Sequence, residues 1–582
     1  MDWKILVAVV IGLLIFGIVQ LCSSDEGPSY DQQLAQERAA KQAERERDRA
    51  AERAAERERA LEEAREQRGE RPPEQTAKLE TDDFVATLTT RGGALRSYQL
   101  KHEQYKESPR DWESGLRDEE SESLVPVNLV TTNPEFDRND PLRFEVFQGL
   151  PSLLPDADYE IVEKSPDRVV LRYRQPGLPV VITKKYEVDT SGPYQIWLTV
   201  QLRNAGDERV ALLPGVVQTG YQHQSEAGGG FLSKQPNLLQ GICRHADTTF
   251  RIPWNDSDAR QTYSGVGVQF TGVETNYFLS AMIPGDDRPT TCNVRAKVGG
   301  SGEQTWGVLR SELRWGEVEL RPGESEVFKV KNYLGPKKFT LLRSVGHDLE
   351  ESVDFGWFWP ISRVLLFLLL MFQKWVVNWG VAIILLTVLV KLTLLPLTHK
   401  SFQSTEKMRA LKPEVDEINK KYKDDPQKKQ QETMALYKRN KVNPLGGCLP
   451  TLLQLPIWFA LFRTLRAAPE LYRAEFFGWI TDLSEPDPYF VTPIIMGALM
   501  FVQQQLTPVT GDGAQAKMLK YFMPVMFTGF MLFLPSGLTL YIAVNTVLSL
   551  LHQLIIHRRR ATKAAAGTAP KPAKPSKTKK KK

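Results

Sequence analysis

The stretch "GVAIILLTVLVKLTLLPLTHK" (380–400) has the apolar composition of a membrane span but carries a charge, Lys391, within its apolar run. At about 1.5 Å per residue, Lys391 lies roughly 18 Å from Trp379 and about 12 Å from His399, which places it inside the span. A central lysine costs about 2.5 to 3.5 kcal/mol on insertion scales, and the surrounding Leu, Ile and Val residues can outweigh that cost. Either the lysine stem extends toward the headgroups or the charge has a function.

Apolar segments elsewhere predict a multi-domain membrane protein with six transmembrane helices. The segment 1–24, with an uncharged run from Ile5 to Leu21, is interpreted as an uncleaved anchor. A cleaved signal peptide or a lipoprotein site at Cys22 fits these residues less well. Five further helices form the predicted membrane core, at 377–398, 446–466, 489–506, 519–535 and 537–556.

The charges of the loops indicate how these spans are oriented. The segment 399–445 and the tail 557–582 are rich in Lys and Arg, so both are expected in the cytoplasm. The loop 467–488 is mainly acidic and suits the opposite side. Since six spans place both termini on one side, the N-terminus is expected in the cytoplasm and the large region after the first span outside.

The region 78–340 shows the two-residue periodicity of β-strands. "YQIWLTVQL", for example, places Ile196, Leu198 and Val200 on one face of a strand. Turn signals such as "TRGGAL" and "DTSGPY" separate many short strands, which predicts a large antiparallel sandwich. The segment 25–77 is highly charged and almost without large apolar side chains, so it is interpreted as a helical or disordered tether.

The sequence of this β region contains no nucleophile elbow or metal-binding motif. We therefore favour a binding or spacer module. A sugar-processing enzyme on a membrane anchor is the alternative. Cys243 and Cys292 are either paired or two free thiols, because their spacing alone decides neither.

Two further helical elements are predicted near the membrane. The segment 354–376 has an apolar centre too short to span and is flanked by tryptophans, which favours an amphipathic helix in the interface. A second span fused to the next segment is the alternative. The segment 399–445 predicts a helical hairpin, whose apolar positions are Met408, Leu411, Val415, Ile418 and Tyr422 on one helix and Met434 and Tyr437 on the other. Its basic exterior suits anionic lipid, other machinery or ribosomal RNA.

Polar side chains also occur within the predicted spans, at Thr387, Gln454, Gln503 and Asn545. Several such residues in one bundle predict a hydrated cavity, which would solvate Lys391. No acidic residue occurs in the five core spans to pair with the lysine. A cation facing a wet groove implies that an anionic group comes to it.

Three stretches, "MALYKRNKVNPLGGCLPTLLQLPIWFALFRTL" (434–465), "DPYFVTPIIMGALMF" (487–501) and "FMPVMFTGFMLFLPSGLTLYI" (522–542), closely resemble the YidC/Oxa/Alb family of membrane protein insertases. The anchor and large outer domain resemble its Gram-negative form, in which that domain is a periplasmic β-supersandwich similar to galactose mutarotases. The resemblance implies a multi-pass protein of the bacterial inner membrane that inserts and helps to fold membrane proteins, alone or with the Sec translocon. It implies no enzyme activity, no cofactor and no metal.

The family resemblance also implies a hydrophilic groove, open to cytoplasm and lipid, that contains a positive residue. Lys391 matches that position, where an arginine is usual, and Thr387 matches another functional position. A Tyr-Tyr pair of the family is Tyr541-Ile542 here. The predicted groove residues are Lys391, Thr387, Gln454, Gln503, Asn545 and Tyr541. The residues predicted to contact the substrate helix, on the third and fifth spans, are Leu455, Pro456, Phe459, Phe527 and Phe530.

The implied partners are nascent membrane proteins, the Sec translocon and membrane lipids, with the ribosome and targeting factors approaching the cytoplasmic hairpin and the basic tail. A transporter or channel, and a membrane-anchored carbohydrate-binding protein, are the alternative functions.

Overall fold

The computed structural model describes residues 71–109, 123–131, 140–150, 153–175, 178–227, 238–257, 260–265, 267–423, 425–440, 442, 449–506 and 521–565, together with a few positions between 59 and 66. The predicted anchor (1–24), most of the tether and the end of the basic tail lie outside the described residues. The chain divides into two compact units. One comprises Met1–Asp354 with Ala467–Tyr472, and the other comprises Phe355–Arg466 with Arg473–Lys582.

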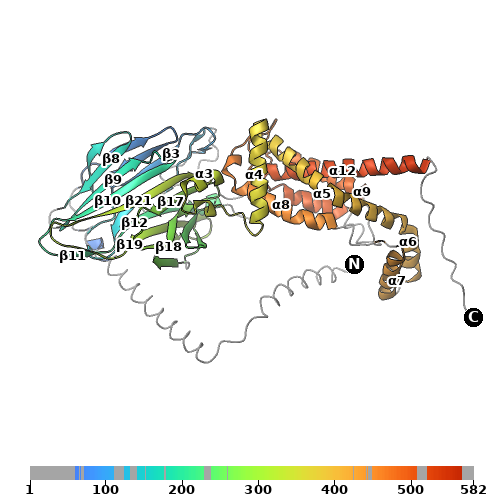
Figure 1. The fold of residues 1–582 in the computed structure, drawn as a ribbon, viewed down its shortest axis with the longest axis horizontal. Helices are drawn as coiled ribbons and strands as arrows, with labels where there is room; N and C mark the ends of the chain where they lie inside the picture. The colour runs from blue at the N-terminus through green and yellow to red at the C-terminus, as the bar shows by residue number, and fades with distance from the viewer. Residues whose placement is uncertain are drawn as a thin grey trace, which may run out of the picture. The chain divides into compact units, whose positions relative to one another are not determined.

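The first unit is an antiparallel β structure built on two large sheets (Figure 1). The described strands of the larger sheet are, in spatial order, β14 (Thr248–Pro253), β13 (Gln240–His245), β16 (Val268–Glu274), β17 (Phe278–Pro284), β21 (Ser325–Pro336), β10 (Gln195–Asn204), β9 (Val180–Val188), β8 (Arg168–Tyr173) and β7 (Glu160–Lys164). Those of the smaller sheet are β15 (Arg260–Gly265), β18 (Thr290–Gly299), β19 (Trp306–Trp315), β12 (Pro214–His223) and β6 (Arg143–Val146).

Shorter strand groups complete this unit. A three-stranded sheet is formed by β1 (Thr76–Glu80), β2 (Phe84–Thr89) and β3 (Ala94–Leu100). Two pairs join β4 (Lys106–Glu107) to β5 (Val125–Pro126) and β11 (Val210–Leu212) to β20 (Val318–Leu320). A short helix, α3 (Phe339–Val345), follows the last strand.

The core of the β unit lies between the two large sheets. The alternation seen in the sequence is the reason: Ile196, Leu198 and Val200 are fully buried on the inner face of β10. Burial of such side chains is worth about 1.5 to 3 kcal/mol each. Cys243 on β13 and Cys292 on β18 form a disulfide that ties the larger sheet to the smaller one. This bond decides the question that their spacing left open.

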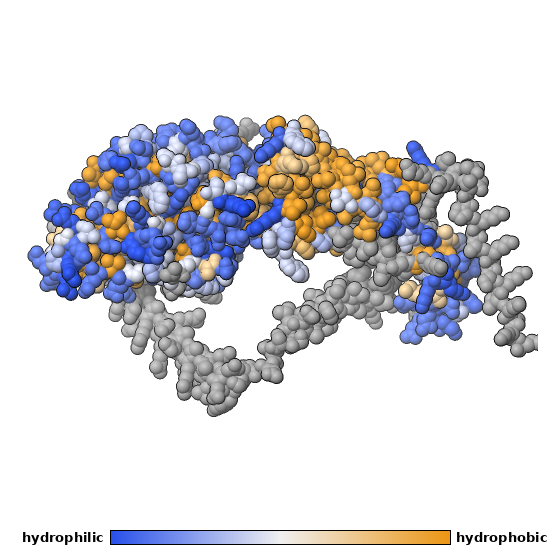
Figure 2. All heavy atoms as spheres, viewed as in Figure 1, coloured by the Kyte–Doolittle hydropathy of each residue, from blue (hydrophilic) through white to orange (hydrophobic). Residues whose placement is uncertain are grey.

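The second unit is helical. Its described α-helices are α4 (Trp359–Val376), α5 (Trp379–Ala410), α6 (Lys412–Lys421), α7 (Pro426–Arg439), α8 (Leu449–Ala467), α9 (Val491–Leu506), α11 (Met523–Met531) and α12 (Ser536–Ala565). Among them, α12 packs against α5 and α9, while α4 packs on α5 and α11 on α9. Figure 2 shows that apolar residues gather over these helices, whereas the β unit presents a mainly hydrophilic surface.

Three helices among the described residues are long and apolar enough to cross a membrane, namely Trp359–Val376, Trp379–Ser404 and Ser536–Ile556. The last two coincide with predicted spans. The first is the segment that the sequence suggested was too short to span, and its composition permits a crossing. Helices α8, α9 and α11 fall within other predicted spans, but α11 has only nine residues. At about 14 Å it is shorter than the hydrocarbon core. The count of six spans therefore stays a prediction.

Helices α4 and α5 are separate. The chain leaves α4 at Val377, whose φ of 60° is left-handed, and re-enters a helix after Asn378. The Asn378 side chain accepts a hydrogen bond from the Val381 backbone N–H (3.1 Å), as an N-cap does. The two helices are therefore not fused into one, and the placement of α4 in the interface stays a prediction.

Beyond α5, the helices α6 and α7 pack on each other (Figure 1). Val415, Leu436 and Tyr437 form their buried core, against which Met408, Leu411 and Ile418 pack. The prediction that Met434 faces inward is wrong, because its side chain is 51% exposed. Leu436 fills that position, since the returning helix is rotated relative to the predicted stripe.

Candidate functional site

The ammonium of Lys391 on α5 is directed at α12. Its Nζ donates hydrogen bonds to Oδ1 of Asn545 (3.1 Å) and to Oγ of Ser549 (2.6 Å). The lysine is half-buried. Both partners are neutral, so within the described residues the charge is held by dipoles and not by a carboxylate. Such a site keeps a net positive charge and can still attract an anion.

The sequence of α12 explains why both partners reach the same ammonium. Asn545 and Ser549 are four residues apart, so they lie on one face of the helix, one turn from each other. The Ser549 hydroxyl also donates to the Asn545 carbonyl (2.7 Å). This bond orients the serine oxygen so that a lone pair faces the lysine. Asn545 was predicted for the groove, whereas Ser549 was missed. Its spacing of four from Asn545 was the available signal.

Thr387 lies one turn before Lys391 and is buried. Its hydroxyl donates to the Ile383 carbonyl of its own helix (2.7 Å). The hydroxyl therefore bonds to the backbone of its own helix, as threonine commonly does in membrane helices, and none of the hydrogen bonds among the described residues joins Thr387 to Lys391. Its predicted groove role stays a prediction.

A second polar contact joins α8 to α12. The amide nitrogen of Gln454 donates to the hydroxyl of Tyr541, and the tyrosine is 2% exposed. Tyr541 precedes Asn545 by four residues, so it lies one turn away on the same face of α12. Thus Tyr541, Asn545 and Ser549 form a polar stripe along α12, contacted from α8 at one end and from α5 at the other.

Gln503, near the end of α9, is half-buried. None of the described hydrogen bonds joins it to Lys391, Asn545 or Tyr541. The structure therefore brings together four of the six predicted groove residues as two contact pairs, Lys391 with Asn545 and Gln454 with Tyr541.

The predicted substrate-contact residues lie on α8 and α11. Three of them expose large apolar side chains: Leu455 (41%), Phe459 (45%) and Phe530 (36%). Pro456 and Phe527 are half-buried. In water, such exposure would be costly, whereas next to lipid or another apolar helix it is favourable. Their contact with a substrate helix stays a prediction.

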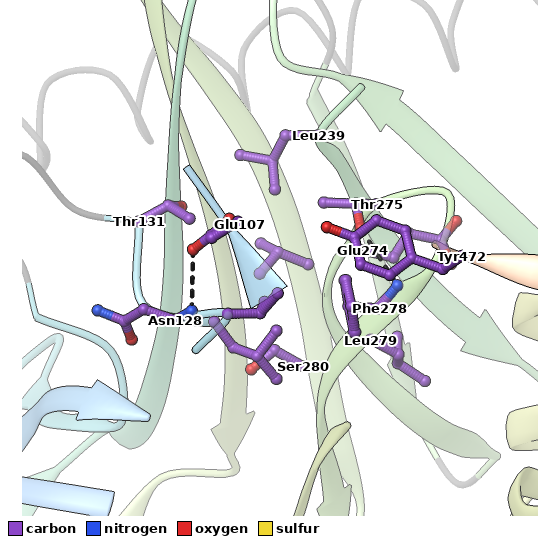
Figure 3. Close-up of a pocket in the computed structure, with 13 residues that line it drawn as sticks. Glu107, Asn128, Thr131, Leu239, Glu274, Thr275, Phe278, Leu279, Ser280 and Tyr472 are labelled. Carbon is purple, nitrogen blue, oxygen red and sulfur yellow. Dashed lines mark hydrogen bonds between the residues drawn. The ribbon is translucent and has the colours of Figure 1, made fainter. Parts of the chain in front are cut away.

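A cavity in the β unit bears on the carbohydrate alternative (Figure 3). It has a volume of about 50 Å³ and is lined by residues that include Glu107, Asn128, Glu274 and Tyr472. A water needs roughly 10–15 Å³ by this measure, so the cavity accommodates a few waters. Glu107 accepts from the Asn128 backbone N–H (3.0 Å).

The second carboxylate of this cavity is also engaged. Glu274 accepts from Arg251 (2.6 Å) and Lys337 (2.9 Å). Burial lowers the pKa of Lys337, although Glu274 opposes that shift. Both carboxylates thus have structural partners, which disfavours a role as a sugar-processing pair. Among the described residues, no group of three or more His, Cys, Asp or Glu side chains is arranged to hold a metal ion.

Two protein-family models match this chain, one over most of the β unit and one over most of the helical unit. A family model described as 60Kd inner membrane protein matches residues 371–563, and one described as YidC periplasmic domain matches residues 76–368. Membrane protein insertase YidC of Anaeromyxobacter dehalogenans (strain 2CP-C) is 38% identical over 508 residues, which cover 85% of this chain and 88% of that protein. Its counterpart in Syntrophus aciditrophicus (strain SB) is 34% identical, with 84% and 85% covered.

A solved structure, described as an active YidC insertase with the first transmembrane domain resolved, is also similar. It is 19% identical and covers 83% of this chain and 92% of that one, with a TM-score of 0.35. The identity and coverage of the curated relatives decide the assignment. With both units matched and 38% identity over most of its length, this chain belongs to the YidC family.

Proposed function

We propose that this chain inserts membrane proteins through a polar groove between α5, α8 and α12, in which Lys391 holds the acidic part of the substrate. The observation that carries the proposal is the direction of the Lys391 ammonium. It points to Asn545 and Ser549 on a neighbouring helix and not outward to lipid. A lysine that snorkelled to the headgroups would not make these contacts.

The general function follows from the relatives. Proteins 38% identical over most of this chain carry the name membrane protein insertase, so the chain is an insertase and not an enzyme. It acts on membrane proteins and, like its relatives, is a protein of the inner membrane.

The first step is capture of a hydrophilic segment. No Asp or Glu occurs in α8, α9, α11 or α12, and in α5 the first is Glu406, far beyond Lys391 in the sequence. The lysine charge is therefore available to an acidic group of the substrate. Two unit charges about 5 Å apart attract by about 3 kcal/mol at an effective dielectric constant of 20. The polar stripe of Tyr541, Asn545 and Ser549 would solvate the rest of the segment.

The second step is release of the apolar helix. An apolar substrate segment would slide along the exposed side chains of Leu455, Phe459 and Phe530 into lipid, driven by burial of its apolar surface at about 25 cal/mol per Å². The membrane potential, worth about 2.3 kcal/mol per charge per 100 mV, would draw acidic groups outward. Neither step requires a cofactor.

The proposal includes an orientation and partners. The basic hairpin and the helix end that follows Ile556 would face the cytoplasm, with the β unit in the periplasm. The exposed basic side chains of α6 and α7 suit the ribosome, targeting factors or anionic lipid. The Sec translocon is the proposed partner in the membrane.

The decisive experiment is controlled depletion of the protein, with a proteomic measurement of which membrane proteins fail to insert. We expect losses to concentrate among proteins whose translocated segments are short and acidic. Unchanged insertion after depletion would contradict the proposal. A transporter or channel would instead give a substrate-specific flux or a conductance in reconstituted vesicles.

A further inference from the structure

The connection that leads into α9, from residue 473 to residue 490, turns most of its carboxylates inward and its aromatic rings outward. Asp487 is 1% exposed, and Asp482 and Glu485 are half-buried. Loops in water usually show the reverse, with charges outside and large apolar rings inside. Four aromatic side chains, which we name the aromatic rim, are exposed here: Phe477 (62%), Trp479 (40%), Tyr489 (69%) and Phe490 (42%).

The buried carboxylate of Asp487 holds the aromatic rim in place. It accepts hydrogen bonds from Nε1 of Trp479 (3.0 Å) and from the Tyr489 backbone N–H (3.0 Å). It also accepts from the backbone N–H and the hydroxyl of Thr492, both at 2.7 Å. The indole N–H of Trp479 is thus satisfied inside the protein while its apolar ring stays exposed. Rings with one satisfied polar end and one apolar end are typical of membrane interfaces.

The backbone beside the aromatic rim packs on the starts of two other helices. The Asn378 side chain, just before α5, donates to the Phe476 carbonyl (3.4 Å), and a Cβ added at Gly380 of α5 would lie only 1.9 Å from the Phe476 ring. At the start of α12, the Ser536 backbone N–H donates to the Glu485 carbonyl (2.7 Å). The connection is therefore fixed at the beginnings of both α5 and α12.

These contacts place the aromatic rim relative to a bilayer. Helices α5 and α12 are both long and apolar enough to cross a membrane, and their apolar stretches begin at Trp379 and Ser536, next to this connection. A spanning helix enters the hydrocarbon core close to the point where its apolar stretch begins. The aromatic rim thus lies at the level of the headgroups, where tryptophan and tyrosine are enriched in membrane proteins.

The aromatic rim is also continuous with an aliphatic surface. Phe490 directly precedes α9, and one turn further along that helix Ile494 (59%) and Ile495 (50%) are exposed. Aromatic rings followed by aliphatic side chains match the change from headgroups to hydrocarbon across a bilayer. This order of side chains favours lipid as the neighbour of the exposed surface.

We propose that the aromatic rim is a lipid-binding surface, whose rings insert among the headgroups of one leaflet. Helix α5 runs from the rim to the basic α6–α7 hairpin, so the rim would meet the leaflet opposite the cytoplasm. By binding there it would hold the starts of α5 and α12 at one height in the bilayer. These are the two helices that Lys391 joins. The inference goes beyond the proposed groove function and does not depend on it.

The test uses the full chain in phosphatidylcholine vesicles that contain a small amount of alkyne-tagged phosphatidylcholine. The photo-crosslinker p-benzoylphenylalanine replaces Phe477 in one variant and Tyr489 in another. The matched control carries it in place of Val162 of β7, an apolar side chain that is 48% exposed in the β unit. After illumination, lipid adducts are measured through the alkyne tag, and protein adducts are measured by mass spectrometry.

We expect a several-fold excess of lipid adducts at positions 477 and 489 over position 162. Replacing part of the phosphatidylcholine by anionic phosphatidylglycerol should leave these yields unchanged, because the rings bind through apolar surface and not through charge. Asp487→Ala should lower the lipid adducts at position 489 several-fold, since it removes the acceptor that fixes the rim. Thr481→Ala, at an exposed position of the same connection, should not.

Three results would overturn the inference. Equal lipid adducts at position 162 would show that exposure alone produces them. Adducts to another part of the chain, or to a second copy of it, in place of lipid would show that protein covers the aromatic rim. Absence of any adduct at positions 477 and 489 would show that the rim faces water. All three are measured with Asp487 intact, so they decide the question even if Asp487→Ala fails to fold.

Discussion

Replacing Lys391 by alanine tests the central claim about the groove. The variant removes the cation that we propose to hold the acidic segment, and it leaves Asn545 and Ser549 without their shared donor. At a contact of about 5 Å and an effective dielectric constant of 20, the lost attraction is about 3 kcal/mol, on the order of 100-fold in occupancy. Lys391→Arg keeps the charge, so we expect near-native insertion despite the different shape of the guanidinium.

The assay is insertion of a single-span substrate, scored by protease access to its translocated segment. Two versions of the segment differ only in Asp versus Asn. We expect Lys391→Ala to impair the Asp version strongly and the Asn version little, because the lost term is electrostatic. Lys391→Met, which retains much of the stem without the charge, should behave like the alanine variant. This control separates loss of charge from loss of packing.

Two results would refute the reasoning. Equal insertion of the Asp version by the native chain and by Lys391→Ala would show that the charge is dispensable. Equal impairment of both versions would show that Lys391 acts only through its bonds to α12, as a structural link between helices. Thermal unfolding of the purified variants checks the second case independently, since loss of two hydrogen bonds costs about 1–3 kcal/mol.

Three further predictions concern the rest of the chain. The first is the removal of the disulfide with Cys243→Ala/Cys292→Ala, two positions that are 49 residues apart. The unfolding free energy of the β unit should fall by about 4 kcal/mol, measured by urea titration of tryptophan fluorescence. An unchanged urea midpoint would contradict this. Burial alone would raise the pKa of Glu312, but Arg310, Arg314 and Arg295 lower it to about 2. Because the pKa of Glu312 is lower in the folded state than in the unfolded one, Glu312 stabilises the β unit above pH 4.5, and this contribution should fade as the pH falls from there toward 2. Glu312→Gln should flatten that part of the plot of urea midpoint against pH. A plot for the variant that runs parallel to that of the native chain would argue against the assignment. Val415→Asp should unfold the α6–α7 pair, because Val415 is only 8% exposed. Met434→Asp, at a position that is 51% exposed, should leave the circular dichroism spectrum unchanged. Similar spectra for both variants would show that the buried cluster does not hold the two helices together.

The sequence predicted the parts of the fold that depend on local pattern. Alternation identified the buried face of β10, and spacing of three and four identified Val415 as a core position of the hairpin. Met434 was misplaced because its helix is short and polar, so the phase of its apolar face was set by too few residues. The boundary between the predicted segments 354–376 and 377–398 coincides with the helix break at Val377, although the left-handed conformation of Val377 could not be read from the sequence.

Long-range pairing was beyond the sequence. Lys391 and Asn545 were each identified as polar residues in apolar spans, but 154 positions separate them, and periodicity states nothing about which helix faces which. The disulfide was undecided for the same reason. Ser549 was missed because a single serine is common in membrane helices, and only the structure shows that this one accepts a hydrogen bond from Lys391.

The choice of neutral partners for Lys391 has a physical consequence for function. A buried carboxylate beside the lysine would stabilise the charge but would also compete with every acidic substrate, and displacing it would leave an unpaired anion in a medium of low dielectric constant. Amide and hydroxyl oxygens lower the cost of burying the ammonium while leaving its charge available. They also bind weakly enough for the ammonium to transfer to an incoming carboxylate and return. A site that must hold many different segments briefly is therefore better served by Asn545 and Ser549 than by an ion pair, and introducing one would trap the groove in its empty state.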